Sequence, residues 1–249
     1  MTGIDFHEPI CESIAMARPT TRRIRGKGPH LSSQQILRRL LKDYGPITWR
    51  PRYDPVSELV FTILSQHTSD INSERAFERL WDHFGSWEAV AEANVEDVAE
   101  PIRIGGLAQV KAPRIKLVLN RITEIHGFLN LDFLSKLSLQ EAKTWLLALP
   151  GVGPKTAAVV LCFALGMPAM AVDTHVYRVS KRLGLIHSKI NADEAHDILE
   201  SMVEPKDVFS FHVCLITHGR KICKAIKPLC GRCTLLKGCP TGMSLEAKK

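Results

Sequence analysis

A cluster of four cysteines near the C-terminus constrains the fold of this chain more than any other feature. The pattern C-x6-C-x2-C-x5-C is formed by Cys223, Cys230, Cys233 and Cys239, all within seventeen residues. The seven cysteines are an odd number and no apolar signal-peptide core is present, so a metal site is favoured over a disulfide framework. Four thiolates bind one zinc ion or a [4Fe–4S] cluster, and the spacing alone leaves both open.

The composition favours a globular protein with a polyanionic partner. The chain has 249 residues, a net charge of +7 and a pI near 9.1. Lysine and arginine side chains that neutralise phosphates release counterions, which strengthens binding to nucleic acid. The longest apolar runs, such as 157–165, are too short to cross a bilayer. We therefore expect no membrane contact and a cytoplasmic location, in the nucleoid if the source is bacterial.

The hydrophobic periodicity predicts an all-α chain. Apolar residues recur at helical spacing from about residue 32 onward, and no stretch alternates over several residues. Capping boxes at Ser138 with Glu141 and at Asn191 with Glu194 predict helix starts. Gly219 is predicted to end the preceding helix.

The loop with the sequence LPGVGPKT, residues 149–156, is the most informative connection. It joins a predicted helix at 139–149 to an apolar one at 155–165. Gly151 and Gly153 allow a tight turn with unobstructed backbone amides, and the proline that follows suits a first helical position. Free amides at a helix start can bind phosphate, although a plain helix–turn–helix corner would have the same glycines.

Two polar residues follow at an informative spacing. Lys155 ends the loop, and Asp173, eighteen residues later, precedes the amphipathic segment THVYRV, where it could also be an ordinary N-cap. The segments LPGVGPKTA and VDTHVYRV together resemble the helix–hairpin–helix DNA glycosylases of the endonuclease III family. The resemblance runs from about 32 to 240. It implies that Lys155 is the nucleophile and that Asp173 is essential.

The resemblance implies a bifunctional base-excision-repair enzyme. In this chemistry a neutral lysine amine attacks the sugar C1′, expels the base and forms a Schiff base, after which β-elimination cuts the strand. A nearby aspartate accepts the proton of the amine and stabilises positive charge on the sugar. The expected substrates are double-stranded DNA with oxidised pyrimidines or other damaged bases, and abasic sites. The protein is expected to act as a monomer.

The resemblance also implies a [4Fe–4S] cluster as the cofactor, because the spacing of the four cysteines matches the cluster site of this family. By contrast, Cys162 and Cys214 lie in apolar segments and are interpreted as core residues.

The target nucleotide must leave the base stack before a lysine can reach C1′. The resemblance places a wedge in the segment SQHTSD at His67, where many members have glutamine, with Gln66 as the alternative. It makes Leu107 a second intercalating residue. The remaining residues assigned to DNA binding, flipping or electrostatic support are Gly151, Val152, Gly153, His175 and Asp70.

The family fold implies two helical domains that flank a DNA-binding groove. A six-helix barrel would span 48–167 and contain the helix–hairpin–helix at about 139–165. The iron–sulfur domain would join 31–47 to 168–240. Residues 1–30 are interpreted as a flexible basic tail and 241–249 as a C-terminal tail.

Two other functions are compatible with parts of the sequence. Monofunctional glycosylases for mismatches or other lesions belong to the same superfamily, but the adenine-mismatch members use a catalytic glutamate where Ile63 stands here. Thymine-mismatch members usually have another residue in place of Lys155. A non-catalytic scaffold that binds lesions would lack Lys155 or Asp173, and both are present.

Overall fold

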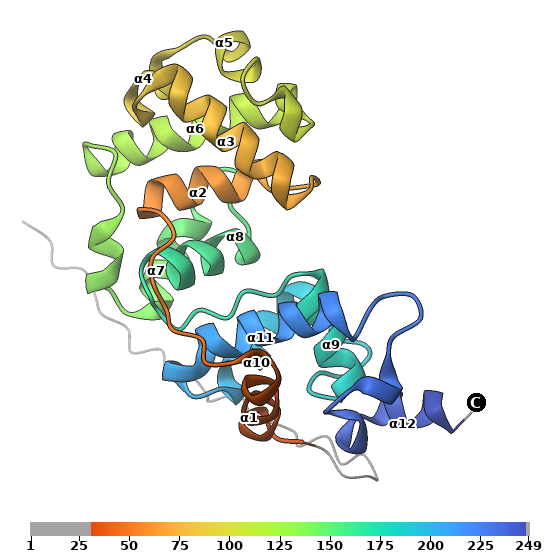
Figure 1. Cartoon of the computed structure of the whole chain (residues 1–249). Coiled ribbons are helices and arrows are strands. Elements are labelled where there is room, and N and C mark those ends of the chain that lie inside the picture. The colour runs from red at the N-terminus through yellow and green to blue at the C-terminus, as the bar shows by residue number, and fades with distance from the viewer. Residues whose placement is uncertain (1–30, 248–249) are drawn as a thin grey trace, which may run out of the picture.

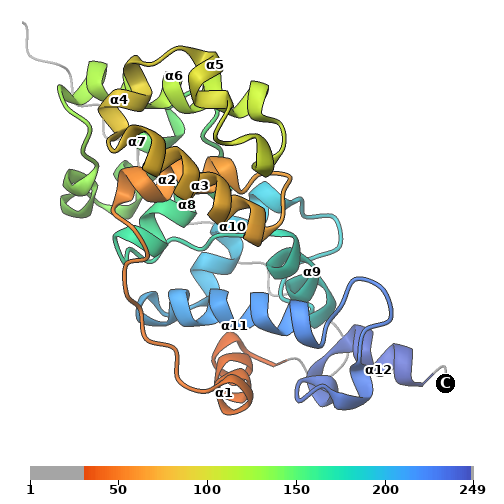
Figure 2. The same ribbon diagram turned by 45° about the horizontal axis from the view of Figure 1, so that its top comes forward.

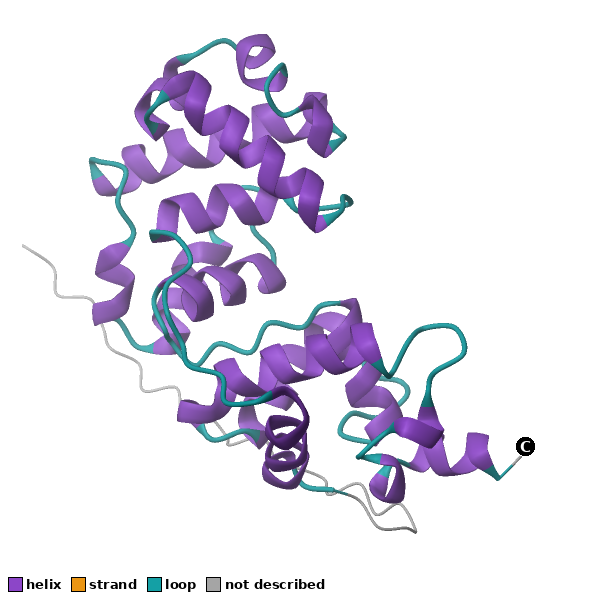
Figure 3. Ribbon diagram, in the orientation of Figure 1, coloured by secondary structure: helices purple, strands orange, loops and turns teal. Residues whose placement is uncertain are grey.

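The computed structural model of the chain describes residues 31–247, and this range is entirely helical apart from its loops (Figures 1 and 3). No residue within it lies in a β-strand, which confirms the all-α prediction. The segment 1–30, interpreted above as a basic tail, and residues 248–249 lie outside the described part. No helix within 31–247 is long and apolar enough to cross a membrane.

Twelve α-helices follow one another in this part of the chain. They are α1 Ser33–Tyr44, α2 Pro55–Leu64, α3 Asp70–Phe84, α4 Trp87–Glu92, α5 Val95–Ala99, α6 Ala108–His126, α7 Leu139–Leu147, α8 Pro154–Val159, α9 Thr174–Leu183, α10 Ala192–Met202, α11 Val208–Lys221 and α12 Pro240–Glu246. The short helical turns are η1 Arg103–Gly105, η2 Asp132–Lys136, η3 Val160–Ala164, η4 Pro205–Asp207, η5 Cys230–Arg232 and η6 Leu236–Gly238.

The helices gather around two hydrophobic cores. One core takes its side chains from 56–171, and the other takes them from 36–40 and 170–239. Figures 1 and 2 show α2 to α8 on one side of the molecule and α1 with α9 to α12 on the other. The predicted boundaries at 48–167, and at 31–47 with 168–240, follow this division closely but stay a prediction.

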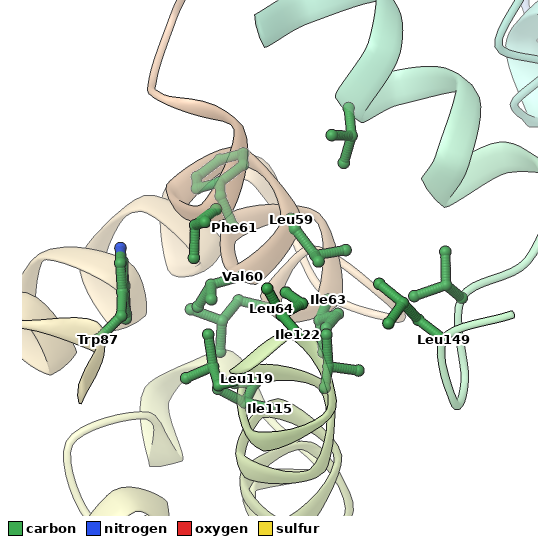
Figure 4. Close-up of a cluster of buried hydrophobic side chains, with 14 of the residues drawn as sticks. Leu59, Val60, Phe61, Ile63, Leu64, Trp87, Ile115, Leu119, Ile122 and Leu149 are labelled. Atoms are coloured by element: carbon green, nitrogen blue, oxygen red, sulfur yellow. The ribbon is translucent and has the colours of Figure 1, made fainter. Parts of the chain in front are cut away.

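Helix α2 lies at the centre of the first core, and all ten of its residues are buried. Figure 4 shows apolar side chains of α2, among them Leu59 and Ile63, beside Ile115 and Leu119 of α6. Each of these four side chains is fully buried. Burial of one such side chain is worth about 1.5–3 kcal/mol, so α2 and α6 form a rigid base for the loops at their ends.

Residues 169–172 lead from the first core to the second, and their side chains belong alternately to the two cores. Ala169 and Ala171 belong to the first core, whereas Met170 and Val172 belong to the second. This alternation fixes the path of the chain just before Asp173 and therefore the position of its carboxylate.

Several predicted helix ends are confirmed and others are corrected. Both predicted capping boxes are present, at the starts of α7 and α10. The helix predicted at 155–165 is α-helical only to Val159 and continues as the π-helical turn η3. There the indole Nε1 of Trp49 donates a hydrogen bond to the carbonyl of Cys162 at 2.8 Å, a partner from a distant segment that periodicity does not reveal.

The C-terminal segment also differs from the prediction. Residues 241–246 of the predicted tail belong to α12, whose N-cap is Cys239. The Cys239 sulfur accepts a hydrogen bond from the amide of Gly242 at 3.3 Å. This segment is therefore part of the structure around the cysteine cluster.

Candidate active site and metal centre

The hairpin between α7 and α8 has the backbone that its glycines predict. Gly151 has φ +74°, and Gly153 is the extended N-cap of α8 with no side-chain cap. Gly151 is exposed, whereas Val152 is 6% exposed and packs into the first core. A Cβ atom on Gly151 would lie 2.9 Å from Nε of Arg114. The backbone of this turn, and not the Val152 side chain, is therefore the part that can contact a ligand.

Lys155 and Asp173 lie at the starts of two helices from the two cores. Lys155 is exposed in the first turn of α8, and Asp173 is the half-buried N-cap of α9. Oδ1 of Asp173 accepts a hydrogen bond from the amide of Val176 at 2.7 Å. The other carboxylate oxygen has no role in this cap, so the residue can cap its helix and take part in chemistry.

His212 of α11 is a buried histidine on which both residues act electrostatically, and sequence reasoning missed it. Its imidazole is buried, and Nδ1 lies 2.8 Å from the carbonyl oxygen of Ala171. Burial lowers the pKa of His212; the Asp173 carboxylate raises this pKa and the Lys155 ammonium lowers it further. Both charges therefore act on one buried ring. A histidine within the apolar sequence VFSFHVCLI was the available signal.

His175 lies among charged groups at the start of α9. Its Nδ1 is 3.0 Å from Nη2 of Arg178, which also donates to the carbonyl of Gly219 at 3.0 Å. Burial lowers the pKa of His175, the Asp173 carboxylate raises it, and Arg178 lowers it. Gly219 does not end a helix as predicted: α11 continues to Lys221. A Cβ at Gly219 would lie 2.9 Å from Cβ of His175, so close packing explains this glycine.

Asp70 forms an ion pair that the sequence did not predict. Its carboxylate lies 2.8 Å from Nη2 of Arg220, which joins the start of α3 to the last turn of α11. Both side chains are more than half exposed, so this ion pair contributes little to stability. Both charges also act on His175, whose pKa Asp70 raises and Arg220 lowers. Support of Lys155 by Asp70 stays a prediction.

The two predicted intercalating loops differ in how their side chains are held. Oε1 of Gln66 accepts a hydrogen bond from Nη1 of Arg114 at 2.8 Å. His67 is exposed with φ 56°, and Leu107 is 53% exposed with φ 54°. Since Gln66 already has a partner within the protein, His67 is the better placed of the two wedge candidates.

All four clustered cysteines line one pocket, together with Arg182 and His218. Arg182 lines the same pocket and donates to the Cys223 sulfur at 3.4 Å. Burial raises the pKa of the Cys233 thiol to about 11, so a bare thiolate is disfavoured there and a cationic metal would be needed to hold it.

The four thiols are candidate metal ligands, and zinc and a [4Fe–4S] cluster both take four thiolates. Among the described residues no three His, Cys, Asp or Glu side chains lie close enough to hold one metal ion. Four sulfurs around one tetrahedral zinc, with Zn–S bonds of about 2.3 Å, would lie within roughly 4 Å of each other.

Comparisons with known proteins agree with this architecture. The family described as "HhH-GPD superfamily base excision DNA repair protein" matches residues 60–205. Endonuclease III of Thermotoga maritima is 37% identical over 75% of this chain and 83% of its own length, and that of Bacillus subtilis is 34% identical over 78% and 85%. A protein of Arabidopsis thaliana named as a DNA glycosylase is 40% identical, and the match spans 68% of this chain but only 57% of that protein.

Solved structures give the same result. A trapped covalent intermediate of endonuclease III with DNA has a TM-score of 0.74 and 30% identity over 87% of this chain and 99% of its own. A thermostable thymine-DNA glycosylase, at 24% identity and a TM-score of 0.67, shares the fold.

The helical fold, the hairpin and the match to residues 60–205 define a DNA glycosylase of the HhH-GPD superfamily, a class of base excision repair enzymes. Within this superfamily the chain belongs to the endonuclease III family.

Proposed function

We propose that this enzyme is a bifunctional DNA glycosylase and abasic-site lyase that acts on oxidised pyrimidines in duplex DNA. The observation that carries the proposal is that Lys155, in the first turn of α8, and Asp173, the N-cap of α9, both act electrostatically on the buried imidazole of His212. An exposed lysine is accessible to a flipped nucleotide, and a half-buried aspartate can accept a proton during the reaction.

The chemistry follows from these two groups. Asp173 takes the proton of the Lys155 ammonium, and the neutral Nζ then attacks C1′ of the flipped nucleotide. The bond from C1′ to the base breaks, and its electron pair leaves with the base, which takes up the proton held by Asp173. The Nζ lone pair then displaces O4′ from C1′, which opens the sugar ring, and a proton from Nζ passes to O4′ to leave a protonated Schiff base. Loss of a proton from C2′ breaks the C3′–O bond and cuts the strand. Water finally hydrolyses the Schiff base and releases Lys155.

Double-stranded DNA with damaged bases is the proposed partner, bound in a groove between the two cores. The hairpin amides at 151–153 would bind a backbone phosphate, and His67 and Leu107 would fill the gap in the stack. Endonuclease III has been captured on DNA both covalently and non-covalently, which supports this proposal for its relative.

We propose a [4Fe–4S] cluster as the cofactor, held by the four thiolates of the pocket described above. When bound, the cluster would cross-link the segment that contains the four cysteines, which has little regular structure of its own. The cationic side chain of Arg182, 3.4 Å from the Cys223 sulfur, would then offset the negative charge of the thiolates. No step of base removal needs the cluster.

A panel of duplexes, each with one lesion, tests the substrate assignment. We expect base release and strand cleavage with oxidised pyrimidines and strand cleavage at abasic sites. Base release without cleavage would identify a monofunctional glycosylase. Tight lesion binding with neither reaction would identify a non-catalytic scaffold, and either result would overturn the proposal.

Replacement of Asp173 by asparagine should separate its two roles. Asparagine caps helices as well as aspartate does, so Oδ1 can still accept the Val176 amide and stability should change by less than about 0.5 kcal/mol. Base release should fall by about 100- to 10,000-fold because the proton acceptor is lost. Thermal unfolding and single-turnover kinetics measure the two effects. If activity survives this change, Asp173 is only a helix cap.

A further inference from the structure

Lys111 is a buried cation that the chemistry described above does not use. It lies in α6 and is 2% exposed. Its Nζ donates hydrogen bonds to the carbonyl of Leu64 at 2.7 Å and to that of Gly105 at 2.8 Å. Within residues 31–247 it forms no ion pair. Burial of an unpaired charge is costly. The two carbonyl oxygens are the groups that stabilise the Lys111 ammonium, so their positions in the fold indicate what this residue does.

The two carbonyls stand at the starts of the two loops that carry the intercalation candidates. Leu64 is the last residue of α2 and leads into His67; Gly105 is the last residue of η1 and leads into Leu107. His67 and Leu107 both have left-handed backbones, at φ 56° and 54°. Such strain persists only where the surrounding structure fixes the chain. Lys111 therefore contacts both loops at the residues where they begin.

Two further contacts join both loops to the face of α6 that carries Lys111. The amide of Lys111 donates to the carbonyl of Leu107 at 2.9 Å. Arg114, three residues later in α6, donates to Oε1 of Gln66 at 2.8 Å and also lies against Gly151 of the hairpin. Residues three apart share a helix face, so one face of α6 contacts three segments that DNA would meet.

We propose that Lys111 is a positioning residue that holds the two intercalating loops in a common register, so that His67 and Leu107 enter the base stack together. The proposal rests on the function proposed above. Without the ammonium group neither carbonyl keeps its buried donor, and each loop moves separately. Duplex DNA then has to order both loops when it binds, at a cost in entropy.

Lys111→Met tests the proposal, because methionine fills similar space without the hydrogen bonds. Lys116→Met is the matched control. Lys116 lies in the same helix, and its Nζ also donates to two carbonyls, those of Ala91 and Ala93, which lie away from both loops. Borohydride trapping rates are measured with an abasic site in a duplex and in single-stranded DNA, where no base stack must be opened.

For Lys111→Met we expect a loss of about 10- to 100-fold in the duplex rate, as small misplacements cause. The single-strand rate should stay within about twofold of the wild-type rate, which a general loss of structure would not allow. Lys116→Met should keep the wild-type ratio of the two rates. An unchanged ratio for Lys111→Met would overturn the proposal. If the wild-type protein traps neither substrate, the proposed function fails instead.

A second measurement decides the matter if Lys111→Met does not fold. His67→Ala and Leu107→Ala are compared singly and together on the duplex in a double-mutant cycle. Loops held in one register should give coupled losses, so that the double variant loses less than the product of the single effects. Losses that simply multiply would show independent loops and overturn the proposal.

Discussion

Lys155→Ala is expected to abolish the covalent adduct that borohydride traps between the enzyme and an abasic duplex. Strand cleavage should fall by at least about 1,000-fold, because removal of the nucleophile in other covalent enzymes costs this much or more. Lys155 is exposed, so the free energy of unfolding should change by less than about 0.5 kcal/mol. Gel analysis of trapped adducts and thermal unfolding measure both effects.

Lys206→Ala is the matched control for this variant. Like Lys155, Lys206 is exposed and follows a proline that opens a helical turn, here η4. The Lys206→Ala variant should trap DNA at the wild-type rate. Undiminished trapping by Lys155→Ala would mean that another amine is the nucleophile, and the lyase assignment to Lys155 would be wrong.

Cys223→Ser is expected to remove the metal cluster and to unfold the segment around it. The wild-type protein should be brown, with broad visible absorption and about four iron atoms per chain, as a [4Fe–4S] cluster requires. The variant should lose this absorption and about 4 kcal/mol or more of stability, since loss of a structural metal is among the largest single-site effects. Between Cys223 and Cys239 the chain has only the short turns η5 and η6, so little else orders it.

Cys214→Ala supplies the comparison. Cys214 is a fully buried cysteine of α11 that does not line the pocket, so its variant should keep the colour and the iron. Iron analysis and absorption spectra of both variants give the result. A colourless wild-type protein that contains zinc would contradict the [4Fe–4S] assignment while leaving a four-cysteine metal site.

Local patterns in the sequence predicted a large part of this fold. Hydrophobic periodicity predicted the all-α class, and the capping boxes at Ser138 and Asn191 predicted helix starts that the structure confirms. These signals are local, since a capping box closes hydrogen bonds within three residues. The cysteine spacing is also local, and it predicted a metal site whose four candidate ligands do line one pocket.

Features that depend on distant segments were wrong or missed. The π-helical turn at η3 has a hydrogen-bond partner in Trp49, more than a hundred residues away. The glycine at 219 was interpreted as a helix end, but the approach of His175 from α9 explains it. The predicted tail after 240 proved to contain α12, which begins at the cluster.

The candidate site also has features that the local sequence predicted and features that depend on distant segments. The sequence by itself determined the helical class, the family-like hairpin with Lys155, the N-cap position of Asp173 and the four thiols, because each depends on residues close together in the chain. Only the tertiary structure decided that Lys155 and Asp173 both act electrostatically on the buried His212, and that Lys111 donates hydrogen bonds at the starts of the loops of His67 and Leu107. Burial and contacts between distant segments arise when two cores pack, and no short stretch of sequence contains that information.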